Sequence, residues 1–480
     1  MVLRRRNLIK FPRRTECYMF KHLRQESGFY RNLLRLSLPL VFQNLLANAL
    51  NLFDIFMVGA LGQTEMASVS LASTPVFIVT LIIFGMQSGS SVLISQYWGK
   101  RNMDAISRVM SLGLIFCAGL TAVFASACWL FSSQIMSVMT DNQELIFFGA
   151  KYLKIIGFAS FLTSFTQMFA ATQRSMENPR FGLYVLAASM ATNTLLNYML
   201  IFGKFGAPKL GVEGAAVATV LSRVVELIIT VVFIAVNRGA GFHLRAMLRP
   251  GIVMLRDFIK YSIPVALNEL IWSLGISIYP VIFGHMSGSA DIISAYTITT
   301  NIERLTTVVT FGIAASTAVI IGKSIGSGKS REEVYSMGAA LNIVSTLIGI
   351  ASGAVMLALT RFVIMPLLFP VFSLTAAAIE ICTGMLLICS FSVPFRAFNC
   401  TNIVGVWRGG GDVGTALVLD TVTLYLYSVP FAAILGLAVG APVLYVYLVI
   451  VSEELLKMAP GILRFRSGKW VNDVTREALS

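Results

Sequence analysis

The chain has 480 residues, of which 56% are hydrophobic and only 12% are charged, and its formal net charge is +14. So few charged side chains cannot cover the surface of a soluble globule of this size. The composition therefore predicts an all-α polytopic membrane protein and excludes a soluble domain.

Apolar segments long enough to cross a bilayer recur along the whole chain. A spanning helix needs about 20 mostly apolar residues. On that rule we predict twelve spans, at residues 36–60, 69–98, 107–131, 147–172, 181–203, 213–237, 256–284, 292–322, 334–358, 376–403, 413–437 and 440–463.

The basic residues outside these spans are distributed asymmetrically. Most lie in alternate loops and at the two ends of the chain, with Lys457 counted among those that follow the last span, and this predicts that both termini are cytoplasmic. The opposite loops hold only Lys151, Lys154, Lys204, Lys209 and Arg361. The positive charge is then a signal of topology, with some contact to anionic lipids, and we expect no nucleic-acid partner. The basic N-terminal segment lacks an apolar core followed by a cleavage site, so we expect no signal peptide.

An internal repeat divides the chain into two halves. The segment "GMQSGSSVLISQYWG" (85–99) aligns without a gap on "GIAASTAVIIGKSIG" (312–326), and "LSLPL" (36–40) recurs as "YSIPV" (261–265). Each half carries six spans, an even number, so both enter the membrane in the same direction. Parallel repeats of this kind hold a substrate between them in transporters.

The repeat predicts the domain organisation. We expect a cytoplasmic arm, an N-terminal lobe, a cytoplasmic linker, a C-terminal lobe and a cytoplasmic tail, at residues 1–35, 36–237, 238–255, 256–463 and 464–480.

Five motifs, in order, carry a family resemblance. They are "NLFDIFMVGALG", "SQYWGKRN", "LIFGKFGAPKLGVEGAAVAT", "RGGGD" and "RSGKW". Together they resemble the multidrug and toxic compound extrusion (MATE) family and its NorM-like branch, from about residue 33 to 470. The resemblance implies twelve helices in two six-helix lobes that form a V, and export of organic cations coupled to H⁺ or Na⁺.

Asp54 is a carboxylate inside an otherwise apolar span. A charged group at the bilayer centre costs about 2.5–3.5 kcal/mol on insertion scales and usually marks a functional site. Asp54 resembles the first-helix acid of the family, whose burial favours proton exchange and which could also bind Na⁺. By the same resemblance, Asn193 and Asn197 complete this N-lobe site, since residues four apart share a helix face. Amides that only join two helices are the alternative.

Charged residues also occur in the spans of the second half. Glu269 lies in the seventh span, where the NorM-like branch carries an acid, although the alignment places that acid nearer Trp272. Glu303, Arg304 and Arg396 form either internal ion pairs or a polar chamber in the C-terminal lobe. Asp412 matches the acid of the "RGGGD" motif, but it also suits a cytoplasmic loop.

The sequence therefore favours a secondary antiporter that exports cationic amphipathic compounds from the cell across the inner (plasma) membrane. A flippase for a lipid-linked or polyanionic substrate is the alternative, kept open by Arg304 and Arg396. A membrane-embedded transferase is disfavoured because no catalytic pair is visible, so we expect no enzyme activity. We expect no cofactor beyond the coupling ion, and a monomer that contacts small organic cations and membrane lipids.

Overall fold

The computed structural model describes residues 22–237, 242–369 and 374–476, and the described chain is helical. The first half forms α2 (Phe29–Gly59), α3 (Gln63–Gly99), α4 (Met103–Ser137), α5 (Gln143–Ser175), α6 (Arg180–Phe202) and α7 (Val212–Val236). A short helix, α8 (Leu244–Leu248), leads to the second half. There follow α9 (Ile252–Gly284), α10 (Ser289–Gly326), α11 (Arg331–Leu359), α12 (Ala376–Cys400), α13 (Val413–Thr423), α14 (Val429–Ala433) and α15 (Val443–Arg466).

Several helices of the second half continue through π-helical turns. These turns are Thr360–Leu368 after α11, Thr401–Trp407 after α12, and Leu424–Ser428 and Ile434–Ala438 on either side of α14. The segment from α13 to Ala438 is thus one long rod, and the described residues form twelve long helices. Helices suit a bilayer because they satisfy every backbone polar group internally. Eleven of these helices are long and apolar enough to span a membrane. The remaining long helix is α15, which is not among those eleven.

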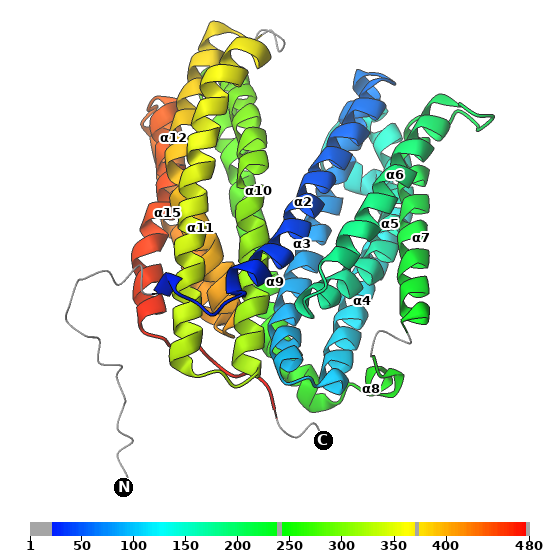
Figure 1. Ribbon diagram of the computed structural model, residues 1–480. Coiled ribbons are helices and arrows are strands. Elements are labelled where there is room, and N and C mark those ends of the chain that lie inside the picture. The colour runs from blue at the N-terminus through cyan, green and yellow to red at the C-terminus, as the bar shows by residue number, and fades with distance from the viewer. Residues whose placement is uncertain (1–21, 238–241, 370–373, 477–480) are drawn as a thin grey trace.

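The twelve long helices form two lobes that diverge from a common base (Figure 1). The base is the end at which α2 begins and the described C-terminal residues lie. There α3 packs along α9 and α10, and α2 packs along α10. One apolar cluster crosses between the halves, joining Tyr97 of α3 to Phe258 of α9. The predicted twelve-helix, two-lobe architecture is confirmed.

Glycines from the sequence repeat allow helices of opposite halves to touch at the base. A Cβ at Gly85 would lie 2.5 Å from the Ala266 Cα, and one at Gly312 would lie 2.7 Å from the Val41 Cγ2. Gly85 aligns with Gly312, and Val41 occupies the place of Ala266 in the other half. The two contacts are therefore equivalent under the internal repeat. This symmetry explains why the repeat is clearest in these segments.

The end of the chain folds back across the base. Residues 467–476, here called the C-terminal strap, run from α15 to α3 and α9 (Figure 1). Trp470 is fully buried, and the Val474 amide donates to the Gln96 side chain at 2.9 Å. Arg476 forms two hydrogen bonds with Asp257 of α9, at 2.5 and 2.6 Å. The predicted cytoplasmic tail, 464–480, is thus packed against both halves as far as it is described.

The helix bounds differ from the predicted spans at both ends of the molecule, and two of the differences at the base fall in the predicted arm and linker. There α2 begins at Phe29, inside the predicted arm 1–35, whose first 21 residues lie outside the described part. Similarly, α9 begins at Ile252, inside the predicted linker 238–255, of which residues 238–241 are not described. Helices extend beyond their apolar stretches because polar residues at a membrane surface continue the same hydrogen-bonding pattern.

Candidate functional site

The N-terminal lobe brings the three predicted site residues together. Asp54 lies near the end of α2, away from the base, and is half-buried. The Asn197 amide nitrogen donates to the Asp54 carboxylate at 2.7 Å and to the Asn193 amide oxygen at 3.0 Å. Asn193 donates in turn to the Thr219 hydroxyl of α7 at 3.3 Å. The result is a chain of polar groups that links α2, α6 and α7.

One hydrogen-bond acceptor among these polar groups has no partner in the described part of the protein. The Asn197 amide oxygen is buried, and no hydrogen bond reaches it from the described residues. Asp54 forms no ion pair with any described residue, so its partners there are neutral. A carboxylate beside a free amide oxygen offers the oxygen ligands that a hard cation such as Na⁺ prefers, and it can equally hold a proton.

A small polar cavity lies deeper in the same lobe. Its volume is about 60 Å³, and its lining includes Gln43, Gln87, Arg174, Arg223 and Glu226. Arg223 and Glu226 form an ion pair within α7, as their spacing in the sequence suggests. Glu226 also accepts a hydrogen bond from Thr166 at 3.1 Å.

Glu269 sits in the middle of α9 and is paired. Its carboxylate lies 2.7 Å from the Arg408 guanidinium, and both side chains are almost fully buried. Arg408 follows the π-helical turn Thr401–Trp407 and donates to the Ser88 hydroxyl of α3 at 3.2 Å. The ion pair lies within the second half, and the hydrogen bond from Arg408 to Ser88 connects it to the first half.

A second buried cluster surrounds Lys457 of α15. Its ammonium lies 2.7 Å from the Glu453 carboxylate and 3.2 Å from the Asp420 carboxylate of α13. Asn268 of α9 donates to Asp420 at 3.0 Å, and the Tyr279 hydroxyl donates to Glu453 at 3.4 Å. The ammonium is thus held by two carboxylates inside the C-terminal lobe.

Glu303 and Arg396 belong to a third group. Arg396 of α12 forms an ion pair with Glu303 of α10 and lies 3.5 Å from the Glu454 carboxylate of α15. Arg304, in contrast, is exposed and forms no ion pair with any described residue. The structure therefore separates Arg304 from the buried pair that its neighbour Glu303 makes.

Asp412 lies in the loop that follows α12. Its carboxylate is 2.7 Å from the Arg464 guanidinium of α15 and accepts a hydrogen bond from Thr415 at 2.7 Å. These contacts fasten the loop to the end of α15, at the base and away from the Asp54 site.

Four charged residues of the second half were not among the predicted site residues: Asp420, Glu453, Glu454 and Lys457. Lys457 was counted with the basic residues that follow the last span, but it is buried within α15. The signal was present, because "SEELLK" places Glu453 and Lys457 at i and i+4, the spacing of an ion pair on one helix face. The described residues contain no group of three or more His, Cys, Asp or Glu side chains that could hold a metal ion.

Comparisons with known proteins identify the family of the chain. The sequence model of the MatE family matches residues 39–199 and 264–434. The chain is 26% identical to a probable multidrug resistance protein NorM of Thermotoga maritima over 92% of this chain and 93% of that one. It is also 24% identical to an uncharacterized transporter, YisQ, of Bacillus subtilis, over 87% of this chain and 90% of that protein.

Solved structures share the fold. One, described as the outward-facing conformation of a multidrug resistance MATE family transporter, superposes with a TM-score of 0.81 at 21% identity, covering 93% of this chain and 96% of that one. Another is a transporter from Pyrococcus furiosus described as having a binding pocket of reverse polarity, with a TM-score of 0.81 at 20% identity, covering 94% and 97%. Since the family model covers both halves of the repeat, the chain belongs to the MatE family of multidrug efflux transporters and is a NorM-like, multi-pass membrane protein.

Proposed function

We propose that this transporter is a secondary active antiporter that exports cationic amphipathic compounds in exchange for H⁺ or Na⁺. The observation that carries the proposal is the Asp54 site, a carboxylate with neutral partners and a free amide oxygen beside it. Ionised Asp54 attracts a cationic substrate, and a proton or Na⁺ on Asp54 cancels that attraction. Release of the substrate follows from this competition.

Coupling requires one further condition. Occupancy of Asp54 must favour one of the two access states, because a ligand with equal affinity for both shifts neither. The diverging lobes and their contacts at the base supply two bodies that can move relative to each other (Figure 1).

The charge balance of the C-terminal lobe supports a cationic substrate. Carboxylates outnumber cationic groups when the three sets of ion-paired side chains in this lobe are taken together, namely Glu269 with Arg408, Lys457 with Asp420 and Glu453, and Arg396 with Glu303 and Glu454. An excess of negative charge in a site of low dielectric attracts cations and repels anions.

The orientation and assembly belong to the same proposal. We infer the orientation from the basic loops at the base, whose charge favours a cytoplasmic position for this end and for both termini, with the plasma membrane as the membrane that the protein spans. The protein then works as a monomer without a cofactor other than its coupling ion, and it catalyses no chemical reaction.

A vesicle assay tests the role of Asp54. Wild type and Asp54→Asn are reconstituted in sealed vesicles, an H⁺ or a Na⁺ gradient is imposed separately, and accumulation of a cationic dye is followed. The substitution keeps the size and the hydrogen bond from Asn197 but removes the charge. We expect normal insertion, equal or higher stability, and loss of gradient-driven export with either ion.

Asp291→Asn is the matched control, since Asp291 lies in the first turn of α10 and accepts one hydrogen bond, from Thr375. It should transport like wild type. Export by Asp54→Asn at the wild-type rate would show that the carboxylate is structural. Export of an anionic dye in place of the cationic one would instead favour the flippase alternative.

A further inference from the structure

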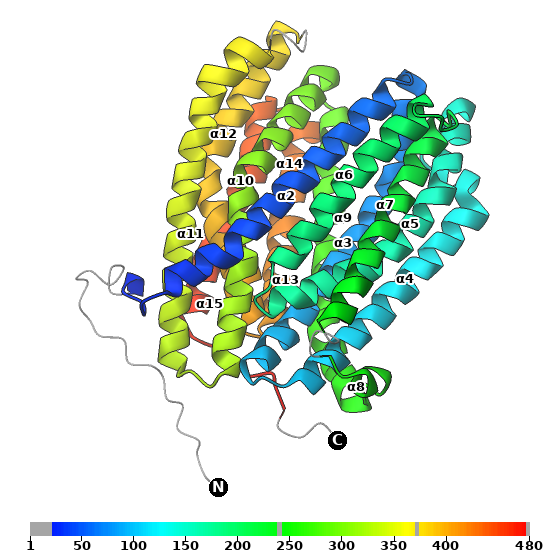
Figure 2. The same cartoon turned by 45° about the vertical axis from the view of Figure 1, so that its right-hand side comes forward.

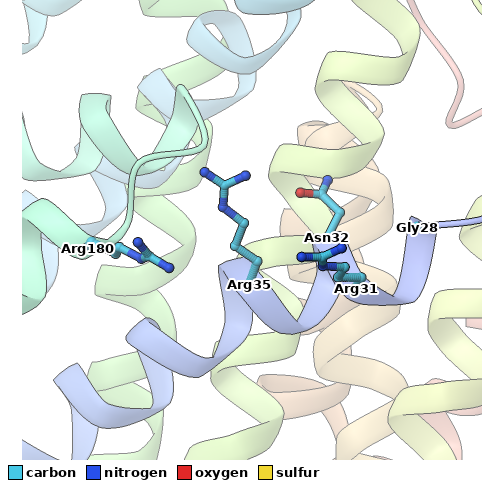
Figure 3. Close-up of a pocket in the computed structure, with 5 residues that line it drawn as sticks. All are labelled: Gly28, Arg31, Asn32, Arg35 and Arg180. Atoms are coloured by element: carbon cyan, nitrogen blue, oxygen red, sulfur yellow. The ribbon is translucent and has the colours of Figure 1, made fainter.

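The base of the molecule contains a cavity that the transport site does not use. Its volume is about 570 Å³, and it is lined by Gly28, Arg31, Asn32, Arg35 and Arg180. In Figure 3, Arg31, Asn32 and Arg35 extend from the start of α2, and Arg180 faces them from the start of α6. The lining thus contains three guanidinium groups and no carboxylate.

These three arginines keep their positive charge unbalanced. Within the described residues, none of them forms an ion pair, and all three side chains are exposed. Three cations around one cavity repel each other, so an anion between them would be stabilised. Guanidinium groups also match phosphate geometry, since each can donate two parallel hydrogen bonds.

A carboxylate that contacts the cavity lining, Glu177, is already engaged. It lies in the loop between α5 and α6, 2.7 Å from the Lys323 ammonium of α10, and it accepts a hydrogen bond from the Trp98 ring at 3.3 Å. Asn32, which lines the cavity, donates to it at 3.4 Å. Burial acts to raise the pKa of Glu177, but Lys323 and these hydrogen bonds hold it below its usual value. Glu177 is therefore ionised at neutral pH and bound to Lys323, and it leaves the arginines unpaired.

The surface beside the cavity is apolar. Arg31, Leu34, Arg35 and Leu38 follow each other at helical spacing on one face of α2. Leu34, Leu38 and Phe42 are 56%, 50% and 55% exposed. Figure 2 shows α2 crossing the outside of the molecule, from the base of the C-terminal lobe toward the N-terminal lobe. A ligand with an anionic group at the arginines and an apolar chain could therefore place that chain against the exposed apolar side chains of α2.

We propose that this cavity binds the phosphate group of an anionic ligand, and that an anionic phospholipid supplies it. A free phosphate compound presents the same chemistry to the arginines but gains nothing from the apolar face of α2. The site is separate from Asp54, so the proposal does not depend on the transported substrate or the coupling ion.

A lipid-retention experiment tests the proposal. The full-length protein and the triple variant Arg31→Gln, Arg35→Gln, Arg180→Gln are purified from vesicles of phosphatidylcholine with phosphatidylglycerol, and retained lipid is measured by native mass spectrometry. We expect wild type to retain phosphatidylglycerol selectively. The triple variant should lose that selectivity, with affinity falling about fivefold for each arginine removed.

The matched control removes the same charge elsewhere. Arg245→Gln, Arg249→Gln, Arg466→Gln replaces three exposed arginines outside the cavity and should retain the lipid like wild type. If both triple variants lost phosphatidylglycerol equally, overall surface charge would explain the retention, and the proposal would be overturned. So would full retention by the cavity variant, once its unfolding midpoint confirms that it is folded.

A second arm identifies the source of the phosphate. Inorganic phosphate and glycerol phosphate are titrated against the lipid-free protein, and the unfolding midpoint is measured. If both soluble phosphates raise the unfolding midpoint less than phosphatidylglycerol does, the result supports the phospholipid as the ligand. Strong stabilisation by a soluble phosphate that is absent in the cavity variant would keep the phosphate site but refute the lipid as its ligand.

Discussion

Asp54 and Glu269 are both carboxylates inside apolar helices, but their surroundings differ. Asp54 is held by a neutral amide, so it can lose its charge without leaving a cation unpaired. Glu269 is held by the buried guanidinium of Arg408, so losing its charge would strand that cation. This contrast favours Asp54 for reversible binding of an ion and gives Glu269 a structural role as the counter-ion of Arg408, which in turn contacts Ser88 of the first half.

The contrast leads to a prediction about stability. Glu269→Gln should lower the free energy of unfolding by about 3–5 kcal/mol, because it leaves Arg408 buried without a counter-ion. The double variant Glu269→Gln, Arg408→Gln should recover much of this loss. Denaturant unfolding in detergent measures both. A double variant that is as unstable as the sum of the two single variants would mean that the residues do not interact.

Part of the site could be predicted from the residues alone. The helical spacing of Asn193 and Asn197 placed these two amides on one helix face, and the family resemblance was needed to bring them to Asp54. An ion pair between Glu303 and Arg396 was one of the two predicted alternatives, and the structure shows it. The partner of Glu269 was not predicted, because Arg408 lies more than a hundred residues away and the helix pairing that joins them depends on tertiary packing. Lys457 was misassigned because its charge resembles the basic residues that mark the cytoplasmic side.

At the scale of helices, the apolar stretches predicted nearly every element, and the repeat predicted their division into halves. They did not predict which helices touch. The contacts of α3 with α9 and of α2 with α10 depend on glycines that let the backbones approach closely. Nor did the pattern of apolar residues predict the π-helical turns after α12 and around α14, because both helix types bury similar faces.

Gly85 provides a test of these contacts. In Gly85→Ala the new Cβ would meet the Ala266 backbone at 2.5 Å, which side-chain rotation cannot relieve. We expect a loss of about 1–3 kcal/mol, as for other overpacked sites, and weaker contact between the halves at the base. The unfolding midpoint in detergent is the measurement.

Gly119→Ala is the control within the same protein. Gly119 lies inside α4, and a Cβ there would meet nothing within 4 Å. Alanine also favours the helix over glycine by up to about 1 kcal/mol. Gly119→Ala should therefore unfold at the same midpoint or higher. If both substitutions changed the unfolding midpoint equally, close packing at Gly85 would not explain the effect.

For the whole molecule, the two halves are held together at the base by contacts of very long sequence separation. The C-terminal strap adds to them, since Gln96 of α3 contacts both the strap and the loop at Gly409. Opening the base would require these hydrogen bonds to break. The strap therefore stabilises the arrangement in which the lobes diverge at the opposite end.

The last prediction concerns this strap. Arg476 anchors it to the buried Asp257, and the amides of Asn472 and Val474 are hydrogen-bonded to Gly410 and Gln96. Arg476→Gln removes the anchor, so hydrogen exchange at these amides should become faster, while amides inside α4 should be unchanged. Arg466→Gln removes an exposed arginine of α15 and should leave the exchange slow. If Arg476→Gln exchanges as slowly as Arg466→Gln, the pair with Asp257 does not hold the strap, and its other contacts, the buried Trp470 and the hydrogen bonds to Gln96 and Gly410, are sufficient.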